Sequence, residues 1–100
     1  CANDTMAISV IKEISTRGLT VPGDISVVGF DDIVLASQIT PALTTVSVPV
    51  EEMAKQSIKL LRSAINNSDL QYQHTALPCK LVLRETAAEI TKKSNKSTGA

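Results

Sequence analysis

The segment Ile25-Ser26-Val27-Val28-Gly29-Phe30-Asp31-Asp32 is a short apolar run that ends in two carboxylates. A run of this kind, rich in valine and isoleucine, is typical of a parallel-sheet strand that is buried on both faces. The turn residues Pro22-Gly23-Asp24 precede it, and Gly29 permits another backbone or a ligand to approach closely. In open α/β sheets, ligands bind just beyond the carboxyl ends of the strands. Because Asp31 and Asp32 stand at such an end, the sequence predicts a binding site there.

Helical and extended patterns alternate on either side of this strand, which is typical of an α/β fold. The first helix is expected between the cap candidates Asn3-Asp4-Thr5 and Gly18, because apolar residues recur there with the spacing of one buried helical stripe. Further along, the pattern predicts about two turns of helix at 33–39, a strand at 43–48, a long helix at 49–65 and a strand at 80–85. Parallel sheets are built from strand–helix–strand units, and here no strand precedes the first helix. We therefore expect the chain to begin within a fold.

Composition limits the classes of function. The 100 residues are 43% hydrophobic, which fits one globular domain or a part of one. Ten basic and ten acidic side chains cancel, so the clustered positive charge of a nucleic-acid surface is not expected within this segment. No apolar run approaches the roughly 20 residues that cross a bilayer, so we expect no membrane partner. Cys1 and Cys79 are too few for a disulfide framework or a zinc site, and we expect reduced thiols in a cytoplasmic protein.

Catalytic chemistry has little support in the sequence. His74 is the only histidine, and it lies in a polar stretch where a solvated loop residue is the expected interpretation. No glycine-rich phosphate loop is present, so we expect neither an enzyme nor a bound cofactor. An acidic pair such as Asp31-Asp32 also follows a strand in phosphate-receiving domains, where it holds magnesium. The third aspartate and the lysine of such a site cannot be placed here, so no metal site is expected.

Asn3 and Asp32 each allow two interpretations. Asp32 is either a cap of the short helix that follows or part of the site. Asp31, the first residue beyond the strand, is a carboxylate that can accept bidentate hydrogen bonds from a polar ligand. Asn3 is either the cap of the first helix or a ligand group, in which case Asp4 supplies the cap. If Asn3 and Asp31 both follow strand ends, they face one crevice, and their donors and acceptors suit a hydroxyl-rich ligand.

Four motifs resemble, in order and spacing, the C-terminal part of a transcription regulator of the lactose/galactose-repressor family. They are Ala2-Asn3-Asp4-x-Met6-Ala7, Gly18-Leu19-x-Val21-Pro22-x-Asp24 continuing through Asp32, Pro41-x-Leu43-Thr44-Thr45-Val46, and Leu77-Pro78 followed by Leu81-Val82-x-Arg84-Glu85-Thr86. The resemblance covers residues 1–88. It implies an α/β chain that forms part of the periplasmic-binding-protein-like (type I) fold, with a mostly parallel sheet flanked by helices.

The same resemblance implies how the chain is divided. Residues 1–48 are expected in the C-terminal subdomain of an effector-binding domain, 49–77 in a crossover segment that belongs to the N-terminal subdomain, and 78–88 in a return strand. Composition predicts a disordered tail over 89–100. Because the apolar face of the helix at 50–65 then lacks its covering sheet, an isolated chain is expected either to pack this helix onto its own strands or to self-associate.

The resemblance also implies a function. A small effector of the sugar, sugar phosphate or purine class binds in the cleft and alters the grip of an N-terminal helix-turn-helix on operator DNA. Positions matching Asn3 and Asp31 contact the ligand, and positions matching Ile8 and Ile39 lie at the interface of a homodimer. This sequence contains no helix-turn-helix, so we expect operator DNA to be a partner of the full-length protein only. The alternative is the C-terminal part of a periplasmic-type sugar-binding protein that serves a transporter.

Overall fold

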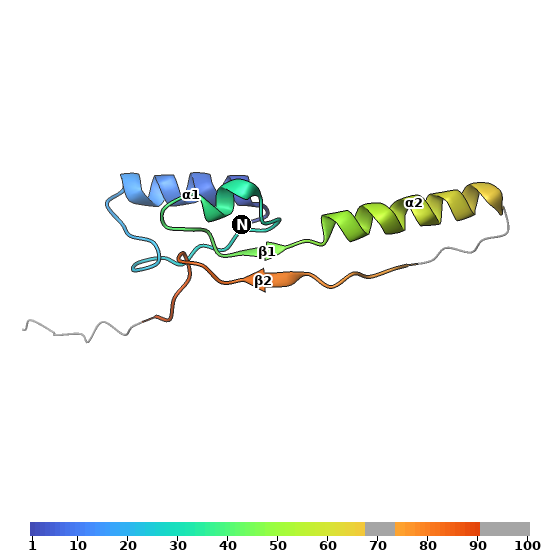
Figure 1. Ribbon diagram of the computed structural model, residues 1–100. Helices are drawn as coiled ribbons and strands as arrows, with labels where there is room; N and C mark the ends of the chain where they lie inside the picture. Colours follow the sequence, from blue (N-terminus) through green and yellow to red (C-terminus); the bar gives the residue numbers. More distant parts are fainter. Residues whose placement is uncertain (68–73, 91–100) are drawn as a thin grey trace, which may run out of the picture.

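The computed structural model describes residues 1–67 and 74–90, while residues 68–73 and 91–100, with most of the predicted tail, lie outside the description. In order along the chain, the elements are α1 (Asp4–Thr16), the 3₁₀ helix η1 (Val34–Ser37), β1 (Thr45–Ser47), α2 (Val50–Asn66) and β2 (Lys80–Val82). Strands β1 and β2 pair in antiparallel orientation, with Thr45 opposite Val82. Figure 1 shows α1 and η1 gathered at one end of the molecule, with α2 leading away from β1 toward the other end.

Helix α1 begins and ends close to the predicted residues. The side chain of Asn3 accepts a hydrogen bond from the Met6 amide (2.8 Å), so Asn3 caps the helix. Gly18 has a φ of 75°, the left-handed conformation that favours glycine after a helix end. Of the predicted apolar stripe, Ala7 and Ile14 are buried and Ile11 is half-buried, whereas Val10 is 40% exposed, so the stripe is confirmed only in part. The expectation that Asp4 supplies the cap is wrong, because its carboxylate is buried and bonded elsewhere.

The central segment, residues 25–31, is held between two neighbouring segments. Residues 1–4 hydrogen-bond to one of its edges, and residues 44–47 pair with the other in parallel orientation. The connections are Cys1 N to Val28 O (2.7 Å), Asp4 N to Phe30 O (3.0 Å), and the isolated bridges Val28–Thr44 and Asp31–Ser47. Residues 44–47 therefore lie parallel to the central segment, but the two pair through isolated bridges and not as continuous strands.

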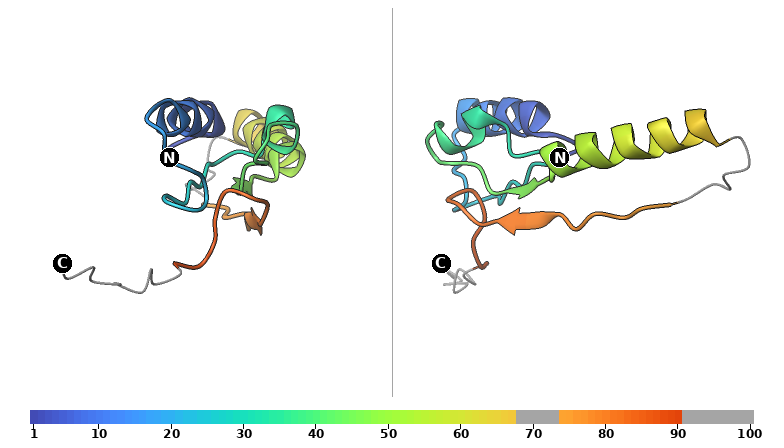
Figure 2. Two further views of the ribbon diagram at one scale, coloured as in Figure 1. Left: turned by 90° about the vertical axis from the view of Figure 1, so that its left-hand side faces the viewer. Right: turned by 45° about the vertical axis from the view of Figure 1, so that its right-hand side comes forward.

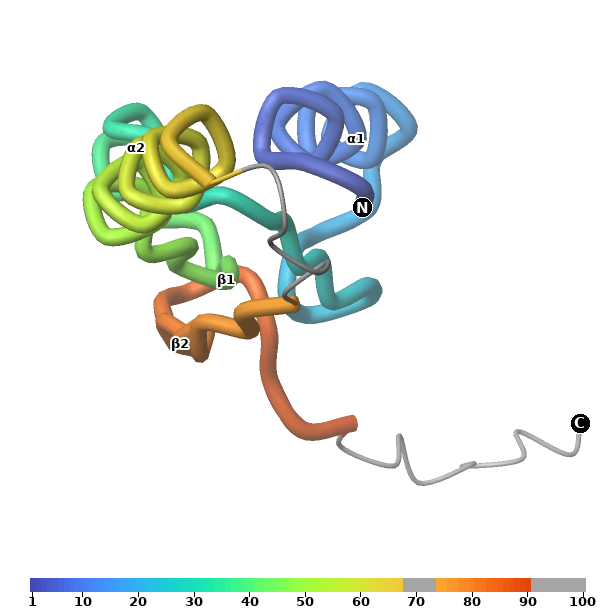
Figure 3. Tube along the Cα trace, turned by 90° about the vertical axis from the view of Figure 1, so that its right-hand side faces the viewer, coloured from blue at the N-terminus to red at the C-terminus, as the bar shows by residue number. Residues whose placement is uncertain are grey.

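Only one face of this central segment is covered. Val27 and Gly29 are buried, whereas Val28 and Phe30 are 38% and 40% exposed. Figures 2 and 3 show the helices on one side of the extended segments, and within the described residues none lies on the other side. The prediction of a strand buried on both faces is therefore wrong for this chain, because an apolar run does not reveal whether a second layer covers it.

The core lies between α1, η1 and the extended segments. Five apolar side chains are buried in it: Ala7, Ile14, Val27, Ala36 and Leu43. The hydroxyl of Thr86 joins this core to the chain beyond β2, since it accepts from the Thr44 amide (2.9 Å) and donates to the Val27 carbonyl (2.7 Å). A buried hydroxyl that satisfies two backbone groups in this way avoids the cost of leaving them unpaired.

The helix predicted at 33–39 is shorter than expected. Val34–Ser37 form a single 3₁₀ turn. Ala36 is its one buried residue, while Val34 and Leu35 are exposed, so little packing supports a longer helix. Pro41 disfavours helical backbone at the residue before it, which ends the helical stretch and returns the chain toward β1.

Helix α2 follows β1 after only two residues, Val48 and Pro49, and extends away from the rest of the fold (Figure 1). Its first turn carries Glu51 and Glu52, whose charges complement the positive end of the helix dipole. No residue of α2 is buried. Of the two expected alternatives, packing of this helix onto the chain's own strands is therefore not observed, and self-association stays a prediction. Across the described residues, no helix combines the length and apolarity needed to span a membrane.

Candidate functional site

Two polar side chains lie at neighbouring ends of extended segments. Asn3 follows residues 1–2, and Asp31 follows the apolar part of the central segment. The amide of Asp4 donates to the carbonyl of Phe30 (3.0 Å), so the residues next to Asn3 and Asp31 are joined directly. Asp31 is exposed and Asn3 is half-buried. The structure thus brings the two predicted ligand-binding residues to the same edge of the fold.

Asn3 caps α1 and still has polar groups to offer. Its Oδ1 accepts the Met6 amide, which uses part of its acceptor capacity. The side-chain NH2 group carries two further N–H donors. Because the bond to Oδ1 fixes the orientation of the side chain, it also fixes the direction of these donors. The two interpretations of Asn3, as a helix cap and as a ligand group, are therefore compatible.

Asp31 and Asp32 adopt an unusual backbone conformation. Their φ angles are 118° and 58°, in a region that residues other than glycine rarely occupy. Such conformations cost of order 1–3 kcal/mol each and persist where surrounding contacts hold them, which is common at ligand sites. Here the Asp31 amide donates to the Val46 carbonyl of β1 (2.9 Å), which is one such contact. The turn therefore presents the exposed Asp31 from a backbone that is held in place.

Asp32 has a structural partner that no local sequence pattern reveals. Its Oδ1 lies 2.7 Å from a guanidinium nitrogen of Arg84, and the side chains of Arg84 and Asp32 are only 19% and 23% exposed. Arg84 also donates to the Leu43 carbonyl (3.0 Å), and its backbone amide donates to the Thr44 hydroxyl (2.9 Å). The cap position of η1 is Ile33, which makes no side-chain bond. Asp32 is therefore not a helix cap, because its carboxylate binds Arg84 instead.

The acidic turn lacks the ligand set of a cation site. Within residues 1–67 and 74–90, no group of three or more His, Cys, Asp or Glu side chains is placed to hold a metal ion. Asp32 is bound to Arg84, and a guanidinium beside the turn opposes cation binding. Asp4 is buried and already accepts hydrogen bonds at both carboxylate oxygens. The arrangement suits a neutral polar ligand better than magnesium.

Ile8 and Ile39, the predicted interface residues, line one groove. Both are half-buried, and both pack against the core, Ile8 from α1 and Ile39 from the segment after η1. The groove measures about 550 Å³, and its other apolar lining residues are Ile11, Leu19, Val21 and Pro41. The structure therefore brings the two isoleucines together on a partly apolar surface.

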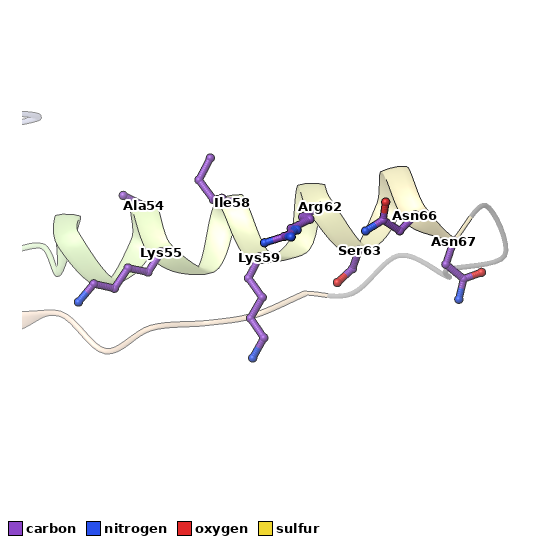
Figure 4. Close-up of a pocket in the computed structure, with 8 residues that line it drawn as sticks. All are labelled: Ala54, Lys55, Ile58, Lys59, Arg62, Ser63, Asn66 and Asn67. Atoms are coloured by element: carbon purple, nitrogen blue, oxygen red, sulfur yellow. The ribbon is translucent and has the colours of Figure 1, made fainter.

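A second hollow, of about 910 Å³, lies along α2 (Figure 4). Its described lining residues all belong to α2 or to Asn67, which follows it. Figure 4 shows Lys55 and Lys59 pointing toward the segment that leads into β2, and Ala54 and Ile58 pointing away from it. Because the described lining residues form a single wall and do not surround a ligand, they make no candidate binding site.

Comparison with known proteins defines the class of domain. A model of the periplasmic binding protein-like domain matches residues 1–87. The lactose operon repressor of Rhizobium radiobacter is 40% identical over 86 residues, which are 86% of this chain and 75% of the relative. The ribose-bound LacI family transcriptional regulator from Enterococcus faecium has a TM-score of 0.79 at 29% identity, over 90% of this chain and 34% of that one. The lac repressor dimer bound to operator and the anti-inducer ONPF has a TM-score of 0.80 at 34% identity, over 88% and 30%.

The matches confirm the type I periplasmic-binding-protein-like fold, of which this chain forms a part. The chain belongs to the LacI family of transcriptional regulators. It spans only 26% of the length of two other curated relatives that it matches. The relatives are named as operon regulators and repressors, not as enzymes. These names favour a regulator over the alternative of a sugar-binding protein that serves a transporter.

Proposed function

We propose that this chain is the effector-binding and dimerisation part of a ligand-responsive transcriptional repressor, with no catalytic role. The observation that carries the proposal is the hydrogen bond between the Asp4 amide and the Phe30 carbonyl (3.0 Å), which places Asn3 and Asp31 at one edge. An effector that contacts both residues bridges two segments that are far apart in the sequence. A ligand that binds one arrangement of the protein more tightly shifts the population toward it, which is how it changes the affinity for operator DNA.

The effector belongs to the sugar, sugar phosphate or purine class, and a sugar is favoured. The Asn3 side chain supplies N–H donors and the Asp31 carboxylate supplies acceptors, a combination that suits neighbouring hydroxyl groups. A related regulator from Enterococcus faecium holds ribose, and the relative from Rhizobium radiobacter is named as a lactose operon repressor. These relatives make ribose and lactose the first probes to use.

In the whole regulator, residues 1–48 and 78–88 belong to the C-terminal subdomain and residues 49–77 to the N-terminal one. The course of the chain supports this division, because β1 leads out to α2 and β2 returns beside β1 (Figure 1). The whole regulator is a cytoplasmic homodimer that contacts operator DNA through an N-terminal helix-turn-helix. In support, the related lac repressor is a dimer bound to operator.

Replacing Asp31 with alanine in the full-length regulator is expected to weaken effector binding. Removing a charged partner of a ligand hydroxyl costs about 1.5–3 kcal/mol, or roughly ten- to more than a hundredfold in affinity. Because Asp31 is exposed, the variant should fold. Titration calorimetry with D-ribose and with lactose measures the change.

The matched control is Glu52→Ala, which removes an exposed carboxylate from α2 and should leave the affinity unchanged. An Asp31→Ala variant that folds and binds as tightly as the wild type would contradict the assignment of this residue. A wild-type protein that binds neither sugar would contradict a ribose or lactose effector.

A lysine in place of Ile8 is expected to weaken the proposed homodimer. Ile8 and Ile39 line the same groove, and a charge buried there between two subunits would have no partner. We expect the dissociation constant of the dimer to rise about tenfold or more, as measured by analytical ultracentrifugation. Ser9→Lys, which places the same side chain at the exposed neighbouring position of α1, is the control. The same dissociation constant for Ile8→Lys and wild type would place the interface elsewhere.

A further inference from the structure

Asp4 is a charged residue with no exposed surface. It makes three hydrogen bonds to three other parts of the chain. Its amide donates to Phe30 O (3.0 Å), its Oδ2 accepts from the Ile33 amide (2.8 Å), and its Oδ1 accepts from the Thr45 hydroxyl (2.5 Å). Burying a carboxylate is costly unless it is fully hydrogen-bonded. Its presence at this place therefore points to a role that an apolar residue does not fill.

The bonds of Asp4 bracket the acidic turn. Phe30 precedes and Ile33 follows Asp31 and Asp32, which have positive φ although neither is glycine. Asp4 thus binds the backbone on both sides of the strained pair. Such a conformation persists only where the surrounding contacts over-determine it, and Asp4 supplies two of those contacts.

The hydroxyl of Thr45 extends the same cluster to β1. The next residue, Val46, accepts the Asp31 amide at its carbonyl (2.9 Å), so β1 contacts both Asp4 and the turn. Gly29 is part of the same close packing, because a Cβ there would collide with Asp4 Oδ1 and lie 3.0 Å from Leu43 Cδ2. One carboxylate therefore connects the end of the central segment, the acidic turn and the strand that leads to α2.

We propose that Asp4 is the positioning residue of the effector site, which holds the Asp31–Asp32 turn in the conformation that presents Asp31 to the ligand and ties that turn to β1. The inference rests on the proposed function and deepens it. Asp4 does not touch the ligand, because its side chain is buried and both of its oxygens are already bonded. It acts through Asp31.

Amide hydrogen exchange in the full-length regulator tests the positioning directly. Asp4→Ala is expected to speed exchange in a peptide covering residues 30–34 about tenfold or more, because the Ile33 amide loses a charged acceptor. Thr45→Val removes one hydroxyl at nearly constant shape and should speed exchange in the same peptide to a smaller extent. Thr5→Ala, an exposed neighbour of Asp4 in α1, is the control and should leave the exchange unchanged. If Asp4→Ala does not fold, Asp4→Asn and Thr45→Val decide the question.

Effector affinity, titrated with D-ribose and with lactose, separates positioning from a merely structural role. If Asp4 acts through Asp31, Asp4→Asn weakens binding in the wild-type background but not in an Asp31→Ala background. Additive losses, or unchanged exchange of residues 30–34 in a folded Asp4→Asn variant, would overturn the inference. If the wild type binds neither sugar, the proposed sugar effector fails, and the exchange measurement still decides the role of Asp4.

Discussion

Replacing Arg84 with alanine is expected to lower the free energy of unfolding by about 2–3 kcal/mol. The change removes the 2.7 Å ion pair with Asp32, whose two side chains are 19% and 23% exposed. It also leaves the Leu43 carbonyl without the donor that Arg84 supplies at 3.0 Å. Removing one partner of a largely buried ion pair is costly because the other charge stays behind without compensation. The shift in the midpoint of urea-induced unfolding measures the loss.

The chain offers a matched control in the exposed pair between Arg17 and Glu13, 2.9 Å apart with side chains 72% and 60% exposed. Arg17→Ala should change the free energy of unfolding by about 1 kcal/mol or less, because water screens and replaces an exposed ion pair. Asp32→Ala should destabilise the protein as Arg84→Ala does, and the double variant should lose less than the sum. Equal losses from Arg84→Ala and Arg17→Ala would contradict a structural role for the half-buried pair between Arg84 and Asp32.

Local signals in the sequence are sufficient to predict α1 and the position of the candidate site. The cap at Asn3, the apolar stripe and the left-handed Gly18 all concern residues a few positions apart, so each can be identified without knowledge of the fold. The rule that ligands bind at strand ends places Asn3 and Asp31 together, and the bond between Asp4 and Phe30 joins the residues beside them.

The parts that sequence patterns miss depend on contacts between distant residues. Asp32 and Arg84 lie 52 positions apart, and Asp4 and Thr45 lie 41 apart. No periodicity or cap signal connects residues at such separations, so Asp4 and Asp32 both resemble caps when they are considered locally. In the same way, the apolar run at 25–30 predicts burial but does not reveal that only one of its faces is covered.

The uncovered face of α2 leads to the largest expected effect, which is self-association of the isolated 100-residue chain. Five apolar side chains of this face are between 45% and 74% exposed: Val50, Met53, Ile58, Leu61 and Ile65. Burying what remains exposed of five such side chains would contribute about 5–9 kcal/mol, which is comparable with the net stability of a whole domain. An apolar face of this size favours association. Size-exclusion chromatography with light scattering, over a range of protein concentrations, measures the apparent mass.

A double variant that replaces Ile58 and Leu61 with glutamine is expected to associate less, because it removes apolar area from the middle of the face and disturbs no buried residue. The matched control replaces Lys59 and Arg62, which are exposed on the same helix, with glutamine and should associate as the wild type does. Urea-induced unfolding of each chain reports whether association and order are coupled. A wild-type chain that stays monomeric at every concentration and unfolds in one cooperative transition would contradict the prediction. Such a result would mean that α2 keeps its apolar face in water at no cost to the rest of the fold.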